Sequence, residues 1–575
     1  MKHLFLLLSF ICLNSVGQNF PFSKMLDKNQ VRARINSTND KFWNYYGNWG
    51  PSYEVPAGSG KHAMFANSIW IGGTDMSGQL HVAANTYKQS GTDFWPGPLD
   101  TTNATAVSGT LMSTYNKVWK IDCDSINAFV NAVNNGQVAS GAFTIPGDIL
   151  SYPGNAGGNF QHQMAPYMDV NGDGIYDPAG SGDYPIIKGQ QQILSIYNDN
   201  FGSHTESMGV PMGLEIHERS FAFSDPNIHD SMQAINYTTF YLYTIYNRSA
   251  NRYNNVFITD WSDVDVGYFA NDLLGTDTVN EFAYIYNDGT NDPTQGTYVG
   301  YGNKPPVSSL MLLPTKCSSD GIDNDNDGTI DEAGERFMMD KTTYYNNNYG
   351  SFLPQTTNPS TALHYYNYMS GYWKDGTSFT QGGDAYGGTN PSSYMYPGDP
   401  QNGTGWTEGT AGNTAGDRRV LLSSGPFSMP AHSKIEWGYA VVFSQDTASV
   451  NTITSFHQCV QRDVKNVRYY YQQHQAPMCT PAVNPPVTTG LIKPEQNLQA
   501  NLFPNPTSGN LKIELNQNIQ SASVTIVDPL GRKVFDKNFQ STYRTDLDIS
   551  SLPQGVYFLT LNSEKGSVCR KIVKR

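Results

Sequence analysis

Short runs of β-branched and aromatic residues, separated by Gly, Pro, Asn and Asp, recur along most of the chain. Such runs are typical of β-strands, because branched and aromatic side chains fill a pleated surface well. The strongest run, residues 237–247, is apolar on both alternating faces, so we expect it to be covered on both sides. The same pattern predicts strands at residues 62–72, 79–87, 237–247, 255–261, 281–286 and 435–444.

Two segments look helical instead. The first, residues 124–133, is short, and the second, residues 455–473, carries a single apolar stripe. That stripe consists of Phe456, Cys459, Val460, Val464, Val467 and Tyr471. Residues 476–500, rich in proline and poor in apolar residues, read as a linker. We therefore expect one β-rich module over residues 18–475, followed by this linker.

The last 75 residues repeat a pattern of short alternating strands cut by proline-containing turns. They open with NLFPNPTSG at residues 501–509 and contain DPLGR at residues 528–532. DISSLPQGVY follows at residues 548–557, and the chain ends in KIVKR. Strands and turns in this order predict a small antiparallel Greek-key β-sandwich.

Taken together and in order, these C-terminal pieces resemble the type A C-terminal sorting domain of the type IX secretion system. The resemblance implies that residues 501–575 are recognised by the type IX machinery. It also implies export through the periplasm to the extracellular space or the outer cell surface. The alternative is an ordinary fibronectin-like terminal domain.

The N-terminus agrees with export. Lys2 and His3 precede an apolar run over residues 4–13, and Ser15-Val16-Gly17 supplies small residues for cleavage. This pattern predicts a signal peptide at residues 1–17. The apolar run is too short to span a bilayer and no other stretch approaches eighteen apolar residues, so we expect no transmembrane segment.

Composition supports an extracellular, mainly β protein rich in β-sandwich structure. Charged residues make up 15% of the chain, against about 25% in an average soluble protein, and there are 36 tyrosines and 54 glycines. Residues 501–575 hold ten basic and six acidic residues, net +4, whereas the whole chain carries −14, so the preceding residues carry −18. A negative body of this size argues against nucleic acid and anionic membranes as partners.

Cysteine usage gives little guidance. Removal of the signal peptide leaves Cys123, Cys317, Cys459, Cys479 and Cys569, and no zinc-ligand spacing occurs among them. An oxidising periplasm permits disulfides. Cys459 and Cys479 are the only pair close in sequence, so the sequence leaves a bridge between them open.

The first candidate metal site is an acidic loop over residues 169–183. Asp169, Asn171, Asp173 and Asp177 take positions 1, 3, 5 and 9 of an EF-hand-like calcium loop, with Gly174 at position 6 and the Ile175 carbonyl at position 7. Alternate carboxylates facing one centre repel each other, so a hard divalent cation is the natural neutraliser. Position 12 is Gly180 instead of an acid, and Asp183 could fold back in its place. The alternative is a solvated Asn-Gly-Asp-Gly turn.

The second candidate is the acidic segment at residues 317–335. Asp323, Asp325, Asp327 and Asp331 take positions 1, 3, 5 and 9, with Gly328 at position 6 and Thr329 giving its carbonyl. It resembles the metal-binding repeats of thrombospondin-type proteins, although position 12 is Gly334 and the acid Glu335 comes one residue late. Both loops together predict Ca²⁺ as a cofactor. A plain acidic loop is the alternative here.

A third group of acidic residues, Asp263 and Asp265, lies on one face of an expected strand. They could hold a cation or mark the point where the strand emerges into solvent. Asp272 and Asp277 follow them in the sequence.

Catalytic motifs are scarce. No Gly-x-Ser-x-Gly elbow, His-Glu-x-x-His pair or complete P-loop is present. Glu215, His217 and Glu218 are weak catalytic candidates, and alternation places the first two on one strand face and Glu218 on the other. Polar side chains on a half-exposed strand would look the same.

The sequence therefore favours a secreted or surface calcium-binding β-protein that acts in binding or adhesion, with a glycan or cell-surface ligand. The alternative is a secreted hydrolase of polysaccharide or peptide, whose paired carboxylates need no local motif. An enzyme should show a deep cleft with two or more acids, or His217 beside an acid. A binding protein should show flat aromatic faces, with its acids used by metal loops.

Overall fold

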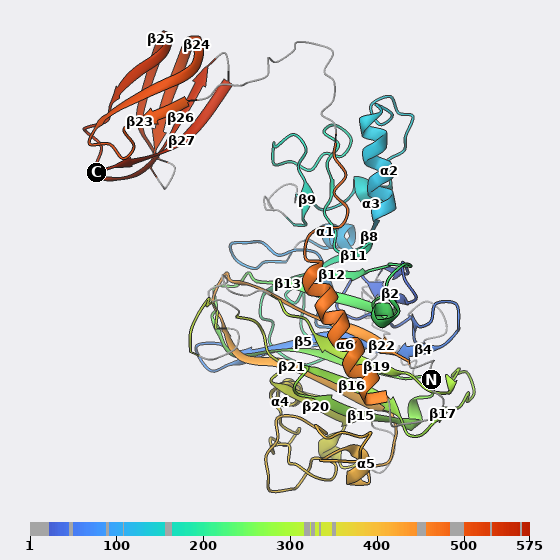
Figure 1. Cartoon of the computed structure of the whole chain (residues 1–575). Coiled ribbons are helices and arrows are strands. Elements are labelled where there is room, and N and C mark those ends of the chain that lie inside the picture. Colours follow the sequence, from blue (N-terminus) through green and yellow to red (C-terminus); the bar gives the residue numbers. More distant parts are fainter. Residues whose placement is uncertain are drawn as a thin grey trace, which may run out of the picture. The chain divides into compact units, whose positions relative to one another are not determined.

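The computed structural model divides into two compact units, Met1–Pro485 and Pro486–Arg575, and each is described by itself (Figure 1). It describes residues 22–44, 50–87, 91–106, 108–155, 164–315, 322–323, 328–332, 335–347, 352–445, 456–483, 500–528, 532–563 and 566–575. The expected signal peptide, residues 1–17, lies outside these ranges, and so do residues 484–499 of the expected linker.

The larger sheet of the first unit is antiparallel. Its strands are β7 (Trp95–Pro96), β8 (Trp119–Asp122), β11 (Gln191–Asn198), β12 (Leu214–Ala222), β13 (Thr238–Asn247), β15 (Asp272–Asp277), β16 (Phe282–Asn287), β19 (Val307–Leu312) and β22 (Lys434–Ser444). They lie in the order β15-β16-β19-β22-β13-β12-β11-β7, with β8 also paired to β11.

A second antiparallel sheet packs against the first. Its strands are β5 (Ala66–Thr74), β6 (Leu80–Ala83), β14 (Tyr253–Asp263), β20 (Lys341–Asn346) and β21 (Arg418–Met429), in the order β20-β21-β14-β5-β6. Tyr241 and Trp437 from the larger sheet share one buried core with Ile258 and Leu422 from this one. Two sheets around a common apolar core form a β-sandwich, and the predicted mainly β fold is confirmed.

Smaller elements flank the sandwich. The short strands are β1 (Ser23–Leu26), β2 (Arg32–Asn36), β3 (Tyr53–Glu54), β4 (His62–Met64), β9 (Tyr167–Met168), β10 (Tyr184–Pro185), β17 (Asn291–Asp292) and β18 (Gly302–Asn303). The helices are α1 (Gly109–Tyr115), α2 (Cys123–Asn134), α3 (Gly147–Leu150), α4 (Ala362–Ser370), α5 (Glu408–Ala411) and α6 (Phe456–Gln473), with 3₁₀ turns at Asp230–Tyr237, Phe269–Asn271 and Pro354–Thr356.

The larger sheet is covered on both faces, as the sequence of β13 predicts. Tyr241 and Tyr243 of this strand enter the sandwich core, while Phe240 and Leu242 point to the opposite face. On that face the apolar stripe of α6 closes a second core, and Figure 1 shows the helix crossing the sheet. Full burial of an aliphatic side chain contributes roughly 1.5–3 kcal/mol, which explains why this helix has a one-sided apolar pattern.

The outer face of the smaller sheet is covered by α4 and the segment that follows it. Tyr365 packs edge-on against Trp70, and Tyr368 stacks on Tyr345 with ring centroids 4.9 Å apart. The Thr361 side chain accepts a hydrogen bond from the third helical residue, and Gly371 ends the helix at φ +86°. Strands of both sheets are therefore buried on two sides, so polar residues on them have little access to solvent.

The remaining sequence predictions of secondary structure are confirmed as well. Each predicted strand segment contains a strand, and the two predicted helices correspond to α2 and α6. No helix in the described part of the chain is long and apolar enough to cross a membrane.

The disulfide joins Cys479 to Cys123, at the start of α2, with Cα atoms 5.4 Å apart. The pair that is close in sequence, Cys459 and Cys479, is not bonded, which corrects that expectation. Nearby, the carbonyl of Pro481 accepts a hydrogen bond from the Tyr184 hydroxyl at 2.8 Å. The described start of the proline-rich segment is thus held against the first unit.

The second unit is a five-stranded antiparallel sheet with its own apolar core. Its strands are β23 (Ala500–Phe503), β24 (Asn510–Val527), β25 (Lys533–Asp548), β26 (Gly555–Ser563) and β27 (Gly566–Lys574). They lie in the order β23-β24-β26-β27, and β25 also pairs with β24. The core includes Leu511, Ile513, Val524, Leu559 and Ile572.

The C-terminal motif residues have structural roles in this unit. In DPLGR, Asp528 accepts hydrogen bonds from the backbone and side chain of Arg532 at 3.0 and 2.8 Å, at the turn that joins β24 to β25. Gly509 has φ +147°, and a Cβ there would lie 2.8 Å from Ser550. The Tyr557 hydroxyl donates to the Pro553 carbonyl at 2.9 Å. The order of these motifs therefore encodes the turns and contacts of one small domain.

Candidate metal centres

The first acidic loop connects β9 to β10, which pair antiparallel and close its two ends. Asp183 is fully buried at the base. Its two oxygens accept hydrogen bonds from the backbone N–H groups of Val170 and Asp177, at 2.9 and 2.8 Å. Asp183 thus folds back onto the loop, as expected of a substitute for the acid at position 12. Both of its oxygens, however, accept backbone N–H groups of the loop.

Within this loop, Asp169 organises the turn. Its Oδ1 accepts the N–H of Gly172 and its Oδ2 accepts the N–H of Gly174, both at 2.8 Å. Gly174 has φ +75°, a conformation that glycine adopts without strain. Asn171 donates to Asp173 at 2.8 Å, so the side chains at positions 3 and 5 lie together. Asp169 therefore fixes the backbone of this turn through its own side chain.

In the part of the second loop that the structure describes, the carboxylate at position 1 again accepts the backbone N–H at position 6. Asp323, at position 1, accepts the N–H of Gly328, at position 6, at 2.9 Å, and Gly328 has φ +97°. Thr329 and Asp331 are exposed. Asp325 and Asp327 lie outside the described residues. The metal-ligand assignment in both loops remains a prediction.

A pocket of about 320 Å³ opens beside the second loop. Asp323 and Gly328 line it from the loop side. Arg252, just before β14, Asn254 of β14 and Phe427 of β21 line it from the sandwich. The lining combines amide, guanidinium and aromatic groups, which suits a polar ligand with an apolar face.

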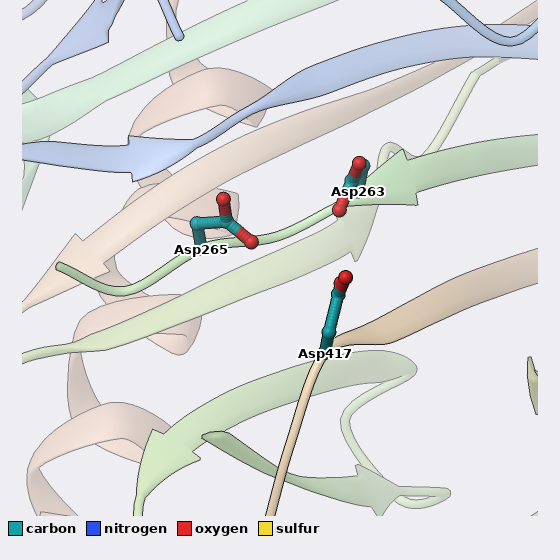
Figure 2. Close-up of side chains that lie close together, drawn as sticks. All are labelled: Asp263, Asp265 and Asp417. Atoms are coloured by element: carbon teal, nitrogen blue, oxygen red, sulfur yellow. The ribbon is translucent and has the colours of Figure 1, made fainter. Parts of the chain in front are cut away.

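The third acidic group is deeper than the sequence suggests. Among the described residues, one set of three acidic side chains brings one oxygen from each within 4.8 Å of the other two: Asp263, Asp265 and Asp417 (Figure 2). Asp263 ends β14, and Asp417 comes just before β21, which pairs with β14. Asp263 is 2% exposed and Asp265 is 6% exposed. The interpretation that they mark the emergence of a strand into solvent is therefore wrong.

Burial and charge dominate the electrostatics of this cluster. Burial raises the pKa of Asp263 well above its usual range, against the opposing attraction of Arg419. Burial and the neighbouring charge of Asp417 raise the pKa of Asp265 to about 7. Arg419 lies 2.8 Å from Asp263 and also contacts Asp417.

Glu215 and His217, the first two weak catalytic candidates, lie side by side on β12 as alternation predicts. The His217 ring is 2.8 Å from Glu215, so the histidine does lie beside an acid. Glu215 is fully buried, and it also binds Arg248 at 2.8 Å and the Leu99 N–H at 2.8 Å. These contacts occupy the carboxylate on a strand that is covered.

Glu218 faces the opposite side of β12, where it is 1% exposed. It accepts hydrogen bonds from Tyr197 and Ser220 at 3.0 and 2.9 Å, and Lys41 lies 3.6 Å away. Burial raises the pKa of Glu218 and lowers that of Lys41. The interpretation of these residues as surface groups on a half-exposed strand is wrong, because both faces are buried.

Asp417 was not found by sequence reasoning. It stands far along the chain from Asp263 and is followed by two arginines, so it reads as an ordinary charged turn. Only the pairing of β14 with β21, which places Asp263 opposite Arg419, brings it to the cluster. No local spacing rule contains that information.

Comparison with known proteins identifies the tail. Residues 501–575 match the family described as secretion system C-terminal sorting domain. The chain is therefore a substrate of the type IX secretion system, exported to the extracellular space or the cell surface, and the sequence prediction is confirmed. No curated protein is similar enough to count as a relative.

Two solved structures give weak matches. A polysaccharide lyase matches at 7% identity and a TM-score of 0.16, over 68% of this chain and 37% of its own. The BSP domain of a biofilm-associated protein matches at 8% identity and a TM-score of 0.12, over 67% of this chain and 60% of its own. The chain thus spans less than two thirds of either protein, and similarity at this level carries no argument.

Proposed function

We propose that this exported chain is a calcium-stabilised β-protein that binds a glycan or another ligand at the cell surface without cleaving it. The observation that supports calcium is the bond between positions 1 and 6, which recurs in both acidic loops. Asp169 bonds to Gly174 and Asp323 bonds to Gly328, at 2.8 and 2.9 Å. Two separate loops wound the same way around an aspartate-rich sequence favour one shared ligand, a hard divalent cation.

In the first loop, Asp169, Asp173 and Asp177 would supply carboxylates, Asn171 an amide oxygen and Ile175 its carbonyl. In the second, Asp323, Asp325, Asp327 and Asp331 would supply carboxylates and Thr329 its carbonyl. The cation would neutralise mutual repulsion and hold each loop closed. Its role in this proposal is structural.

The pocket beside the second loop is where we place the ligand. Asn254 and Arg252 offer donors for hydroxyl or carboxylate groups, and Phe427 offers an apolar wall. Closure of the second loop by calcium would fix Asp323 and Gly328, which form part of the same lining. Ligand binding would then depend on calcium.

The alternative, a secreted hydrolase, draws support from the contact between His217 and Glu215 at 2.8 Å. A general acid or base must reach the substrate, directly or through one water. Glu215 is fully buried and His217 is 4% exposed. Binding is therefore the better-supported function.

Calcium is expected to raise the melting temperature of the full chain. With dissociation constants of roughly 10⁻⁴ to 10⁻³ M, typical of extracellular loops, 10 mM calcium would stabilise each loop by about 1.4–2.7 kcal/mol. Asp173→Ala and Asp327→Ala should each remove part of this gain, as measured by calorimetry in calcium and in chelator.

Asp75→Ala is the matched control for these two variants. Asp75 also accepts backbone N–H groups in a tight turn, from Ser77 and Gln79, but it lies outside both loops. Its calcium-dependent gain should equal that of the parent. Identical melting curves of the parent in calcium and in chelator would refute the structural role of both loops.

Retention of the full chain on immobilised glycans or on cells is expected to need calcium and the pocket. Arg252→Ala combined with Asn254→Ala should weaken retention at least tenfold. The pocket then lacks two hydrogen-bond donors, and the ligand groups that they would bind are left unpaired. The control is Lys434→Ala, an exposed basic residue of β22 away from the pocket lining. Release of ligand fragments during the assay would instead favour the hydrolase.

A further inference from the structure

The cluster of Asp263, Asp265 and Asp417 holds more negative charge than its described surroundings balance. Arg419 is the basic residue that contacts it among these residues, through Asp263 at 2.8 Å and through Asp417. Three carboxylates and one guanidinium leave two negative charges. Asp263 and Asp265 are almost fully buried, and the interior screens such charges far less than water does.

The carboxylate of Asp265 has no hydrogen bond or ion pair with any residue that the structure describes, although only 6% of the residue is exposed. Figure 2 shows one of its oxygens turned toward the space between Asp263 and Asp417. Buried polar side chains nearly always have a partner. An unpartnered carboxylate aimed into a group of other carboxylates points to a positively charged ligand between them.

Asp272 provides a second, separate sign of a missing partner. It is fully buried, and its Oδ2 accepts the N–H of Val266, the residue after Asp265, at 3.1 Å. Its backbone carbonyl accepts the N–H of Gly416, the residue before Asp417, at 3.0 Å. Within the described part of the chain its Oδ1 has no hydrogen-bond partner.

Another buried acid in this region has hydrogen-bond partners for both carboxylate oxygens. Asp292 is also fully buried, and both its oxygens accept backbone N–H groups, at 3.1 and 2.6 Å. Asp265, within the cluster, has a carboxylate with no described partner, and Asp272, beside the cluster, has a buried Oδ1 without a described hydrogen-bond partner. The deficit is therefore local.

The geometry matches a small, oxygen-preferring cation. Calcium binds carboxylate oxygens at about 2.3–2.6 Å, so two of its ligands can lie at most about 5 Å apart. One carboxylate oxygen from each of the three aspartates lies within 4.8 Å of the oxygens from the other two. All of these ligand atoms are carboxylate oxygens, so the site would favour a hard cation over a soft metal.

We propose that Asp263, Asp265 and Asp417 bind one divalent cation, calcium or magnesium, at a third site that is independent of the two acidic loops. The ion cancels the two negative charges that Arg419 leaves. It also ties the end of β14 to the start of β21, at the edge of the ladder that joins these strands. Two of its three ligands, Asp263 and Asp265, are buried, so its role is to lock the sandwich.

The test uses the full chain with Asp173→Ala and Asp327→Ala, which disable the two loops. Equilibrium dialysis against calcium alone or magnesium alone, with ion content measured by mass spectrometry, should give one bound ion per chain. Asp265→Asn in this background should weaken its binding at least tenfold. Asp260→Asn is the matched control: Asp260 is a buried aspartate of β14, the strand that ends just before Asp265, but Asn67 and Ser262 already donate to it, so the ion should remain.

The melting temperature supplies a second readout, measured in chelator and in calcium or magnesium. Because Asp265 has no described partner, Asp265→Asn should not lower the melting temperature in chelator, since it only removes a repelling charge. In calcium or magnesium the same variant should lack the rise that its parent shows. If Asp265→Asn did not fold, the partly exposed Asp417→Asn would replace it.

Two results would overturn the proposal. One is the absence of a bound ion in the loop-disabled parent, which would mean that protons balance the cluster. The other is an ion that remains bound in both Asp265→Asn and Asp417→Asn. Neither result depends on whether the two acidic loops bind calcium.

Discussion

Deletion of residues 501–575 is expected to abolish export, so that the truncated protein accumulates in the periplasm. These residues match the sorting-domain family and fold around their own apolar core. The deletion therefore removes a recognition module and leaves the core of the first unit intact. Immunoblots of periplasm, cell surface and medium, compared with the parent, measure the change.

A point variant separates loss of the folded domain from loss of chain length. Gly509→Val places a side chain within 2.8 Å of Ser550 at a residue with φ +147°, so the domain should not fold and export should fail. Lys537→Ser, an exposed change on β25, should leave export unchanged. The truncated chain at parental levels outside the cell would disprove the role of the tail.

Glu215→Ala is expected to destabilise the first unit by about 3 kcal/mol, because it leaves Arg248, whose side chain is 14% exposed, without its fully buried partner. Arg248, at 2.8 Å, and the Leu99 N–H would both lose their acceptor. The free energy of unfolding from denaturant titration measures the effect.

Glu436→Ala is the matched control for this variant. Glu436 belongs to the same sheet and pairs with Arg219 at 3.5 Å, but 38% of its side chain is exposed. A solvent-exposed ion pair contributes about 0–1 kcal/mol, so this loss should be small. If Glu215→Ala kept full stability and lost a measurable hydrolytic activity, the hydrolase would be the correct interpretation.

The sequence predicts the strands and helices of this protein better than it predicts what their residues contact. Residues 237–247 show a strand covered on both faces, and residues 455–473 show a helix with one apolar stripe, because each pattern is local. Alternation also places Glu215 and His217 on one face of their strand. Alternation does not show how deeply a strand is buried, because polar and apolar residues can alternate in the same way on a covered strand and on a half-exposed one. The ion pairs of these residues therefore became visible only in the folded chain.

Contacts between distant segments account for the other differences. Cys459 and Cys479 are close in sequence, but α6 rises about 1.5 Å per residue and carries Cys459 away from Cys479. The partner of Cys479 comes from α2 instead. Asp417 reaches Asp263 only through the pairing of β14 with β21. Both facts depend on strand order and helix direction, which local spacing does not encode.

The bond between Cys123 and Cys479 closes residues 123–479 into a covalent ring. Two open segments leave this ring, one before Cys123 and one after Cys479, and the sorting domain belongs to the second. A cut anywhere after residue 479 shortens the tail and leaves the ring whole. A cut inside the ring opens it without releasing a fragment, provided that the bond stays oxidised. The body can thus lose its export signal, or be cut once within residues 123–479, and still remain a single covalent molecule.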